Sequence, residues 1–462
     1  MLKGLEVAEV LLSNLEFSGR LDAEYYRPEH LRAESLLEKR GAVALSNVSN
    51  FLIGPFGSAF SVENYCDDPA FRYIRGKDVK PMAIEENDNV YMPREDYERL
   101  SKYALKAGDV LVSVVGTIGN SALIEPQHIP AIFSCKSTAV RTRGLDPCYL
   151  VAYLNSSYGR GLLIRKARGA IQQGLNLGDL QSLKVFVAND VLQARIAKVH
   201  QLATHKKAKS VTALEQAEST LLDTLGIKNW HAPEPLSYIR TSSEAFAAGR
   251  LDAEYFTPRV RRLLALLRRD GLTIGSVAPV RHEAFQAKLA SGTFRYIEIG
   301  DMRNDGTVDA AELAISEAPS RATQYVHNGD VLTSTVRPIR RLSAAISSAQ
   351  DGAVCSSGFV VLNPINISTS TLVTYLRLPV VCELMDLHCS ASLYPAISER
   401  DLLALPIPRI SQSVQHAVDQ KVQAAHTAKH RATELLEAAK RAVEIAIEDS
   451  EASAMKYLEA FK

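Results

Sequence analysis

The stretch Arg20-Leu21-Asp22-Ala23-Glu24-Tyr25-Tyr26, with Pro28 two residues further on, decides how this chain is organised. It returns as Arg250-Leu251-Asp252-Ala253-Glu254-Tyr255-Phe256 with Pro258, at an offset of 230 residues. Only the last aromatic residue of the word has changed. Because similarity at a constant spacing is the signature of duplicated structural units, the rest of the chain is expected to repeat as well.

Other words repeat in the same order. Phe71-Arg72-Tyr73-Ile74 returns at 294–297, an offset of 223, and Gly108-Asp109-Val110-Leu111 returns at 329–332, an offset of 221. Weaker matches keep this spacing and pair Cys135 with Cys355, Tyr153-Leu154 with Tyr375-Leu376, and Asp179-Leu180 with Asp401-Leu402. The order is conserved and the offsets drift only by loop-sized amounts, so the sequence predicts a tandem duplication.

Each copy divides into a β-rich part and a helical part. The residues after the repeated Gly-Asp turn, 110–115 and 331–336, are rich in β-branched side chains and predict strands. The stretches near 190–226 and 411–460 have almost no Gly or Pro and are rich in Ala, Leu, Glu and Lys, which predicts helix. We therefore expect a domain over 1–188, a helix over 189–227, a second domain with its lead-in over 228–408, and a helix over 409–462.

Both predicted helices carry an apolar stripe. In the second helix the stripe advances by alternating steps of four and three, as in a coiled coil, with Lys429 as its one polar position: Val418, Val422, Ala425, Ala432, Leu436, Ala439, Val443 and Ala446. The first helix has a looser stripe: Ile196, Val199, Ala203, Val211, Leu214, Ala217, Leu221 and Leu225. The four helix histidines, His200, His205, His426 and His430, are expected on solvated faces. The predicted fold class is α+β, with two tandem β-rich domains and long helices that pair antiparallel with approximate two-fold symmetry.

Composition and charge exclude several classes of protein. The chain is 46% hydrophobic and 23% charged, which is typical of a globular protein. Its 53 Lys and Arg against 52 Asp and Glu give a net charge of +1, so any basic surface must be local. No apolar run approaches the roughly 18 residues of a membrane helix, no signal peptide is recognisable, and six scattered cysteines form no C-x-x-C. These features indicate a cytoplasmic protein with no membrane segment.

Motifs for catalysis are missing. Gly76-Lys77 lacks the glycine of a phosphate-binding loop, because Phe71 stands five residues before Gly76. Asn363-Pro364-Ile365-Asn366 lacks the second proline and the aromatic residue that an amino-methyltransferase needs to hold a flipped base. His388 and Cys389 are adjacent, which is the wrong spacing for a zinc site with Cys382. The sequence predicts no catalytic site, no metal and no cofactor bound to this chain.

Local clusters of basic and polar residues are the most informative feature of the first copy. Gln makes bidentate hydrogen bonds to adenine and Arg to guanine in the major groove, while glycine-rich turns bring backbone N–H groups to phosphate. The candidate DNA contacts are Ser58 in the word Gly54-Pro55-Phe56-Gly57-Ser58, Arg75, Lys77, Thr117, Asn120, Lys136, Arg165, Arg168, Gln172 and Gln173.

The second copy offers Arg303, Arg337, Arg340 and Arg341 as candidate DNA contacts. For any one residue of either copy, ordinary solvated surface is an equally good interpretation, and only the clusters together favour DNA binding. The repeated Arg-Leu-Asp-Ala-Glu-Tyr word is interpreted differently, as a structural element that ties a chain segment down.

The organisation resembles the specificity (S) subunit of type I restriction–modification systems. The resemblance covers essentially the whole chain and is carried by the Arg-Leu-Asp-Ala-Glu-Tyr-Tyr-x-Pro word together with these stretches: 54–58, Tyr73-Ile74-Arg75-Gly76-Lys77-Asp78-Val79, Gly108 to Ser113, Gly116-Thr117-Ile118-Gly119 and Gln173-Gly174-Leu175-Asn176. The second copy departs from the pattern, because Ser357-Gly358 replaces Ser137-Thr138 and no Gly-Pro-Phe-Gly-Ser word is obvious near 280–290.

The resemblance implies a non-catalytic subunit that addresses a catalytic complex to double-stranded DNA. Each target-recognition domain would read one half of a bipartite, asymmetric target, and the helices would fix the spacer between the halves. Two methyltransferase subunits would bring S-adenosylmethionine and methylate adenine, and a restriction motor-nuclease subunit would cut unmodified DNA. Half-sites one turn apart lie about 34–36 Å from centre to centre, a distance that helices of roughly 50 Å would span.

Two other functions stay open at this point. A non-catalytic scaffold for protein partners would have the same duplicated domains but no salt-dependent affinity for DNA. A specificity subunit of a related DNA methylation or defence system would differ only in the identity of its catalytic partner. The target bases do not follow from the sequence.

Overall fold

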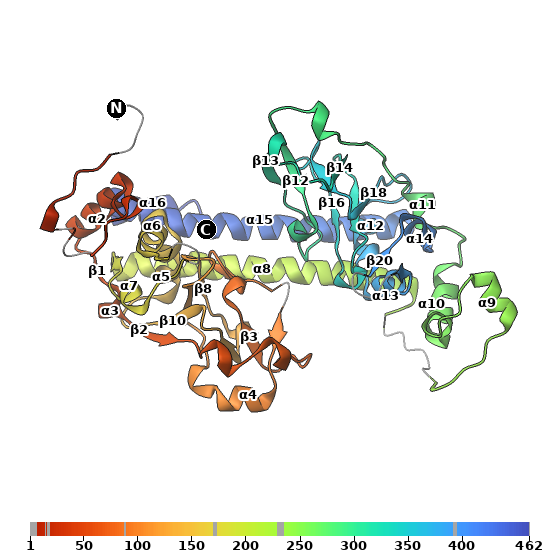
Figure 1. Ribbon diagram of the computed structural model, residues 1–462, viewed down its shortest axis with the longest axis horizontal. Coiled ribbons are helices and arrows are strands. Elements are labelled where there is room, and N and C mark those ends of the chain that lie inside the picture. The colour runs from red at the N-terminus through yellow and green to blue at the C-terminus, as the bar shows by residue number, and fades with distance from the viewer. Residues whose placement is uncertain are drawn as a thin grey trace. The chain divides into compact units, whose positions relative to one another are not determined.

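The computed structural model describes residues 7–13, 15, 19–86, 89–169, 173–228, 235–390 and 395–461. Two compact units make up the chain (Figure 1). The first combines 1–207 with 430–462, and the second is 208–429. Helices α8 (Asp190–Leu225) and α15 (Gln412–Glu448) each contribute one half to either unit. Both units mix small sheets with helices, so the predicted α+β class is confirmed.

The first unit has two main sheets. The order in the four-stranded sheet is β2 (Ser49–Ile53), β10 (Ser137–Thr142), β7 (Val110–Ser113), β8 (Ser121–Leu123), and in the three-stranded sheet β6 (Val90–Tyr91), β3 (Arg72–Ile74), β9 (Ala131–Phe133). Two strand pairs join β1 (Val43–Ala44) to β11 (Lys184–Val185) and β4 (Val79–Lys80) to β5 (Ala83–Ile84). The helices are α2 (Pro28–Lys39), α3 (Leu45–Val48), α4 (Arg94–Arg99), α5 (Pro147–Asn155), α6 (Ser157–Lys166), α7 (Leu177–Gln181) and α16 (Glu451–Leu458).

The second unit repeats this plan. The order in its sheets is β16 (Ser343–Ala345), β15 (Val331–Ser334), β18 (Phe359–Leu362), and β13 (Ala311–Ala314), β12 (Thr293–Ile297), β17 (Val354–Ser356), β14 (Ala322–Tyr325), with a separate pair β19 (Cys389–Ser390) and β20 (Ala396–Ile397). Its helices are α9 (Ser242–Ala248), α10 (Pro258–Leu267), α11 (Ile274–Val277), α12 (Thr369–Leu376), α13 (Pro379–Leu387) and α14 (Glu399–Ala404).

The strand pairings of the two units match. β7 lies between antiparallel neighbours β10 and β8, as β15 lies between β18 and β16. The parallel pair of the other sheet is β3 with β9 in one unit and β12 with β17 in the other. Helix α5 packs on β7 and β8, and α12 packs on β15 and β16. The words that repeat in the sequence therefore lie at equivalent places in two copies of one fold.

The repeated Gly-Asp turn makes the same backbone contact in each unit. Gly108 and Gly329 both have φ of 93°, which favours glycine, and each lies two residues before its strand, β7 or β15. One oxygen of Asp109 accepts the Lys106 N–H at 2.9 Å, and one of Asp330 accepts the His327 N–H at 2.8 Å.

The arginine that neutralises the buried aspartate comes from a different chain segment in each of the two units. The Arg141 Nε donates to Asp109 at 2.9 Å from β10, whereas the Arg281 Nε donates to Asp330 at 2.8 Å. Arg281 follows Val280, which forms a single β-bridge with Leu362 of β18. The arginine of the second unit therefore comes from the segment beside β18, whereas the arginine of the first unit lies on β10 itself. The requirement for a partner is physical, because a buried carboxylate without a cation is costly.

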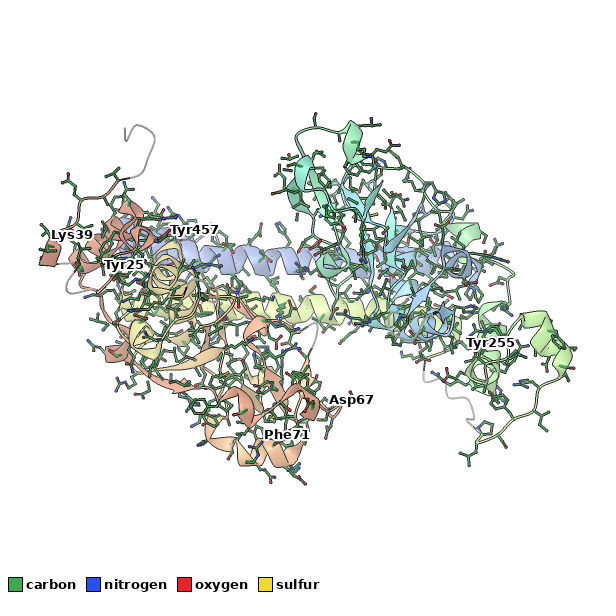
Figure 2. The ribbon with its side chains drawn as sticks, viewed as in Figure 1. Tyr25, Lys39, Asp67, Phe71, Tyr255 and Tyr457 are labelled. Carbon is green, nitrogen blue, oxygen red and sulfur yellow. The ribbon has the colours of Figure 1, made fainter. Side chains whose placement is uncertain are left out.

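In the structure the Arg-Leu-Asp-Ala-Glu-Tyr word of the first unit ties a chain segment down. Tyr25 of this word is labelled in Figure 2. The guanidinium of Arg20 donates to both oxygens of Asp22, at 2.6 and 2.5 Å, lies over the ring of Tyr25, and reaches the Ala167 carbonyl at 3.2 Å just after α6. Such carbonyls at a helix C-terminus favour a cation. The segment before α2, which we call the first arm of the chain, is thereby tied to its unit.

Arg250 repeats these contacts in the second unit. It donates to both oxygens of Asp252 at 2.7 Å, lies over Tyr255, and reaches the Leu387 carbonyl at the end of α13 at 2.6 Å. The ring of Tyr255 is labelled in Figure 2.

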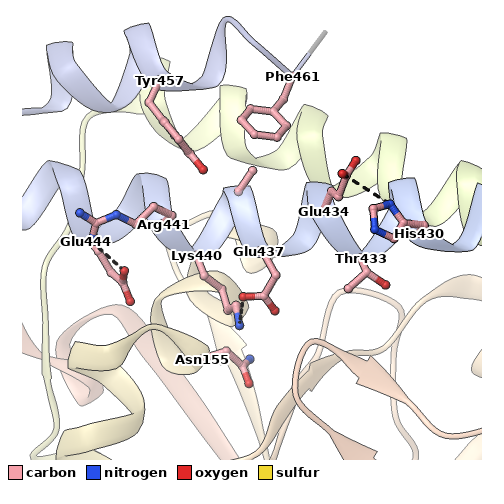
Figure 3. A pocket seen from close by; sticks show the side chains of 11 residues that line it. Asn155, His430, Thr433, Glu434, Glu437, Lys440, Arg441, Glu444, Tyr457 and Phe461 are labelled. Atoms are coloured by element: carbon pink, nitrogen blue, oxygen red, sulfur yellow. Dashed lines mark hydrogen bonds and ion pairs between the residues drawn. The ribbon is translucent and has the colours of Figure 1, made fainter. Parts of the chain in front are cut away.

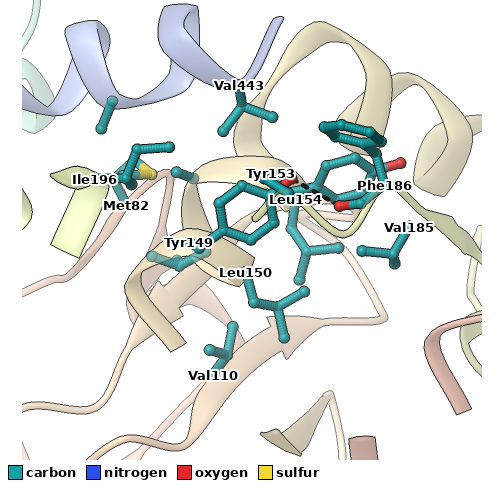
Figure 4. Close-up of a cluster of buried hydrophobic side chains, with 14 of the residues drawn as sticks. Met82, Val110, Tyr149, Leu150, Tyr153, Leu154, Val185, Phe186, Ile196 and Val443 are labelled. Atoms are coloured by element: carbon teal, nitrogen blue, oxygen red, sulfur yellow. Dashed lines mark hydrogen bonds between the residues drawn. The ribbon is translucent and has the colours of Figure 1, made fainter. Parts of the chain in front are cut away.

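Each unit builds its main core against halves of both long helices. In the first unit Ile196 of α8 and Val443 of α15 belong to one core (Figure 4). Val199 of α8 and Ala439 of α15 belong to the same core. In the second unit Leu221 of α8 shares a core with Val418 and Val422 of α15. The early part of α8 thus packs with the late part of α15 and the reverse, which is antiparallel pairing. Burying one such Leu, Ile or Val contributes about 1.5–3 kcal/mol.

The buried surface of each long helix is broader than the single apolar stripe predicted from the sequence. Leu435 rather than the predicted Leu436 is fully buried, and Val211 of the other predicted stripe is 51% exposed. The expectation that His200 is solvated is wrong, since it is 3% exposed. The reason is that α8 packs against the sheet domain as well as against α15, so it buries two faces.

The second long helix stops before the end of the chain. It ends at Glu448, and Ser450 caps α16 by accepting the Ser453 N–H at 3.2 Å. Among the described residues, no helix is long and apolar enough to cross a membrane.

The tyrosine pair of the repeat makes one hydrogen bond in both units. Tyr153 donates to the Lys184 carbonyl and Tyr375 donates to the Pro406 carbonyl, both at 2.7 Å. Both rings are fully buried, and burial raises the pKa of each phenol above its ordinary value. The two bonds fasten the helices α5 and α12 to the strand or loop that precedes each long helix.

We predict that Tyr153→Phe and Tyr375→Phe each lower the free energy of unfolding by about 1–3 kcal/mol, because each leaves a buried carbonyl without its donor. Urea unfolding followed by circular dichroism would measure this. The matched control is Tyr97→Phe, whose ring stacks on Phe71 at 4.4 Å but whose hydroxyl has no hydrogen bond within the described part of the chain. Equal losses in all three variants would contradict the prediction.

Candidate nucleic-acid interface

The Gly-Pro-Phe-Gly-Ser loop packs tightly on one neighbouring turn. A Cβ atom at Gly54 would lie 2.5 Å from the Ser134 carbonyl oxygen, so only glycine fits there. Ser58 lies in a short 3-10 turn, Gly57–Ala59, and is exposed. Phe56 between the glycines is exposed as well. The loop therefore approaches residue 134 by its backbone and presents its side chains outward.

The turn at Gly76–Asp78 lies on the same neighbour. The Gly76 N–H donates to the Ser134 hydroxyl at 3.1 Å, and a Cβ atom at Gly76 would lie 2.8 Å from the Cβ of Lys136. The buried Asp78 accepts the Arg75 N–H at 2.8 Å and pairs with its guanidinium at 2.9 Å. The side chain of Arg75 is thus engaged within the turn, while Lys77 is exposed.

The end of β7 connects these segments. The Thr117 hydroxyl lies 3.0 Å from that of Ser113, the last residue of β7, and 3.3 Å from the Gly76 carbonyl. The backbone of Lys136 accepts the Val114 N–H at 2.9 Å, and its side chain is exposed.

Asn120 lies below this surface. Its side chain is buried and donates to the Val79 carbonyl at 3.1 Å. In this structure Asn120 supports the turn from inside.

The segment after α6 closes on the same strand. Arg168 and Gly174 exchange backbone hydrogen bonds at 2.8 and 2.9 Å, and the Leu175 N–H donates to the Val114 carbonyl at 2.9 Å. Gln173 is exposed, and Gln172 lies outside the described residues. The guanidinium of Arg168 pairs with both oxygens of Asp179 at 3.1 Å.

The sequence predicts Arg165 as a DNA contact on the surface, and the structure places it elsewhere. It is buried, donates to the Tyr25 carbonyl at 2.7 Å and pairs with Glu34 at 2.6 Å. Burial also lowers the pKa of its neighbour Lys166. In this structure Arg165 holds the first arm of the chain, together with Arg20.

We call the segments 54–58, 75–78, 113–117, 134–136 and 173–174 the β7 loop cluster. They are far apart in the sequence and meet at the carboxyl end of one strand. Their exposed polar side chains are Ser58, Lys77, Thr117, Lys136 and Gln173. Such a set combines cations that neutralise phosphate with hydroxyl and amide groups that hydrogen-bond base edges.

The second unit has an equivalent set of loops at the end of β15. The Thr335 N–H donates to the Gly358 carbonyl at 2.9 Å, and a Cβ atom at Gly358 would lie 2.9 Å from Ile299. Val336 forms a single β-bridge with Ala396, as Val115 does with Gly174 in the first unit. We call the segments 299–301, 334–337, 356–358 and 395–397 the β15 loop cluster.

Of the second copy's predicted arginines, Arg337 lies in this cluster. Its N–H donates to the Pro395 carbonyl at 2.9 Å, its side chain is exposed, and its φ of 50° is in the left-handed region. Arg340 follows three residues later and is exposed.

Arg341 and Arg303 make other contacts. Arg341 pairs with Glu218 of α8 and donates to the Arg377 carbonyl at 2.6 Å, and Arg303 pairs with Asp309. Burial and the neighbouring Arg341 lower the pKa of Arg377 to about 10. Arg341 thus belongs to a charged cluster that fastens the domain to α8, and the structure does not bring it to the β15 loop cluster.

Sequence reasoning missed the exposed apolar residues of these surfaces. Phe56 lies in the β7 loop cluster, and Ile339 follows Arg337 in the short turn Pro338–Arg340. An aromatic or aliphatic residue between turn-forming residues in a surface loop was the available signal, since loops on a rigid scaffold often carry binding residues.

A pocket of about 500 Å³ lies elsewhere in the first unit, along α15 and α16 (Figure 3). Tyr457 and Phe461 face charged residues of α15, of which Lys440 pairs with Glu437 at 2.6 Å. These charges neutralise one another. Among the described residues, no group of three or more His, Cys, Asp and Glu is placed to hold a metal.

We predict that Gly54→Ala destabilises the β7 loop cluster, because the new methyl group would clash with the backbone of residue 134. The free energy of unfolding should fall by about 1–3 kcal/mol. Gly57→Ala is the matched control in the same loop, since a Cβ there meets only the Cys135 sulfur at an ordinary 3.8 Å. Equal stability of both variants in urea unfolding would show that the loop is not packed in this way.

Comparison with known proteins gives structural neighbours only. No protein-family model matches the chain, and no curated protein matches it either. The S subunit of a type I restriction-modification system from M. genitalium is 13% identical, with 90% of this chain and 95% of that chain covered at a TM-score of 0.37. The HsdS subunit from Thermoanaerobacter tengcongensis is 16% identical, with 91% and 96% covered at 0.27.

A third solved structure concerns complex assembly and conformational transition of the type I R-M system. It is 17% identical to this chain, with 88% of this chain and 96% of that chain covered at a TM-score of 0.30. The chain is thus similar, over most of its length, to S subunits of type I restriction-modification systems at TM-scores below 0.5.

Proposed function

We propose that this chain is the sequence-specific DNA-recognition subunit of a type I restriction–modification complex. The observation that carries the proposal is the recurrence of one loop arrangement at the end of one strand in both units. Val115 and Val336 make the equivalent bridge in each cluster, while the exposed side chains around them differ. Two surfaces with one frame and different side chains suit a protein that recognises two different half-sites.

In the proposed mechanism each loop cluster recognises one half of a bipartite, asymmetric target. Lys77, Lys136 and Arg337 would contact phosphates, and Gln173 with Gln172 would contact base edges. Net charge is only +1, so the catalytic partners would supply much of the attraction for phosphate. DNA binding by the isolated chain is therefore expected to be weak.

The chain itself would carry out no catalysis. Two methyltransferase subunits, with S-adenosylmethionine, would methylate adenine in each half-site, and a restriction motor-nuclease subunit would cut unmodified DNA. The helices α8 and α15 would set the spacer. At 1.5 Å per residue the 36 residues of α8 extend about 54 Å, enough for half-sites about 34–36 Å apart.

The decisive experiment is sequencing of methylated adenines in cells that carry this gene and its neighbouring methyltransferase gene, compared with a deletion of this gene alone. A split motif with two short halves and a fixed gap, lost in the deletion, is the expected result. Absence of any motif that depends on this gene, with an active methyltransferase, would instead favour a protein scaffold.

The same measurement tests residue roles. Gln172→Ala with Gln173→Ala should relax one half of the motif and leave the other half and the gap unchanged. Gln127→Ala, an exposed glutamine of the same unit outside the β7 loop cluster, is the control and should leave the motif intact. Simultaneous loss of both halves would mean that the units are not independent in recognition.

We predict that helix length sets the gap between the halves. Inserting seven residues after Ala208 of α8 and seven after Ala428 of α15 keeps the heptad pattern and adds about 10 Å to each helix. Because one base pair advances DNA by about 3.4 Å, the methylated motif should gain a spacer of about 3 base pairs. An unchanged spacer in a folded, active variant would refute a role of the helices as a ruler.

A further inference from the structure

Phe56 stands in the middle of the loop 54–58, and its side chain is 83% exposed. A single exposed apolar residue is ordinary on a protein surface. Phe56, however, lies inside the β7 loop cluster, among exposed lysine, hydroxyl and amide side chains. A large aromatic ring that is left in water at a candidate binding surface indicates a ligand that buries it.

The chain before Phe56 is held in place. Gly54 and Pro55 are buried, and a Cβ atom at Gly54 would lie 2.5 Å from the Ser134 carbonyl oxygen. Proline also restricts its own φ, so the backbone that leads into Phe56 has little freedom.

The chain after Phe56 is held in place as well. The Ala59 N–H donates to the Phe56 carbonyl at 2.8 Å, and the Arg99 guanidinium donates to the Ala59 carbonyl at 2.8 Å. Phe60 is buried, with its ring centre 4.8 Å from that of Tyr73. The loop therefore holds the ring of Phe56 outward before any ligand arrives, so little conformational freedom is lost when the ring is buried.

Groups that suit DNA accompany this ring in the cluster. The side chains of Lys77, Lys136 and Gln173 are exposed. A Cβ atom at Gly57 would meet the sulfur of Cys135 at 3.8 Å, so the loop lies over the residue that precedes Lys136. Phosphates, hydrogen-bonding base edges and the methyl group of thymine are all accessible from the major groove. An apolar ring among cations and an amide matches that combination of groups.

The buried Phe60 identifies the matching position in the second unit. Phe60 shares a small core with Tyr73. Phe285 shares one with Tyr296, which repeats Tyr73 at the offset of 223 residues. Phe285 thus takes the place of Phe60.

The segment before Phe285 has no counterpart of Phe56. Residues 282–284 are His, Glu and Ala, and the structure describes all three. The side chain of His282 lies 3.6 Å from Glu399, and that of Glu283 lies 2.8 Å from His327. Since no large apolar side chain stands in 282–284, a role of the ring belongs to one unit and to one half-site.

We propose that Phe56 is a specificity-determining residue that packs against the C5-methyl group of a thymine in the major groove of one half-site. The inference rests on the proposed function and deepens it, because it names one feature of the base that the first unit recognises. Contact with this methyl group distinguishes thymine from cytosine, which has hydrogen at the same carbon. Under the proposed function the adenine that is methylated in each half-site pairs with thymine, so every half-site contains at least one such base.

The test compares duplexes in which the thymines of the recognised motif are replaced one at a time by deoxyuridine. This replacement removes the methyl group and leaves the base pair intact. The full-length chain is assembled with the methyltransferase subunit and S-adenosylmethionine, and Kd for each duplex is measured by fluorescence anisotropy. For the wild-type complex we expect a thymine in one half-site whose replacement raises Kd about fourfold, the effect of one methyl group that is no longer buried.

Phe56→Ala should raise Kd for the unmodified duplex about tenfold, because the ring no longer covers the base edge. The complex of this variant should be indifferent to the replacement of that one thymine and should respond to the other replacements as the wild type does. Phe56→Leu keeps an apolar side chain and should keep the fourfold effect.

Val62→Ala and Leu289→Ala are controls. These residues are 71% and 82% exposed but lie outside the β7 loop cluster. Both complexes should respond as the wild type to every replacement. The circular dichroism of all the variants should equal that of the wild type, because the altered side chains are exposed.

The outcomes separate this inference from the proposed function. A wild-type complex with no sensitive thymine, or the same fourfold effect in Phe56→Ala, would overturn the methyl contact and leave the proposed function standing. A wild-type complex without preference for any motif would overturn both. Fewer methyltransferase subunits on Phe56→Ala than on the wild type, counted by native mass spectrometry, would assign the ring to a protein interface and overturn the contact with DNA.

Discussion

The structure depends on two hydrophobic cores in which the long helices α8 and α15 pack against each other and against a sheet domain. Each helix contributes apolar residues to both compact units, with Ile196 and Leu221 of α8 in different cores. Because each half of a helix buries one side against the other helix and another against a domain, its buried residues occupy more than one narrow stripe. This requirement explains the buried His200 and the frequent alanines of α15, such as Ala439 and Ala442. A shift of register in the helix pair would disturb both cores at once.

The duplicated units show which contacts the fold demands and which it leaves variable. The Gly-Asp turn, the arginine that pins the arm, and the tyrosine hydroxyl that reaches a carbonyl are the same in both units. The cation beside the buried aspartate is kept, but Arg141 and Arg281 supply it from different segments. The fold therefore requires a cation beside the buried aspartate, but it does not require that cation to come from one fixed position.

The two loop clusters combine a constant frame with variable side chains. Backbone hydrogen bonds and β-bridges hold the loops of both units at the end of β7 and β15. Backbone contacts tolerate substitution of the side chains, so the exposed residues of the loops can change without loss of the fold. Residues such as Gly54 and Gly76 are exceptions, because their Cβ positions are already occupied by a neighbouring segment.

The sequence by itself determined the duplication, the α+β class and the two long helices. Collinear words and heptad spacing are local patterns, and local patterns survive without knowledge of the tertiary contacts. It also indicated the loops at Lys77 and Gln173, because the turn-forming residues Gly76 and Gly174 mark surface segments. Only the tertiary structure decided which polar residues are exposed. Arg165 and Arg341 look like surface cations in the sequence, yet their partners Glu34 and Glu218 lie 131 and 123 residues away. Such partners come together through folding, which no local spacing encodes.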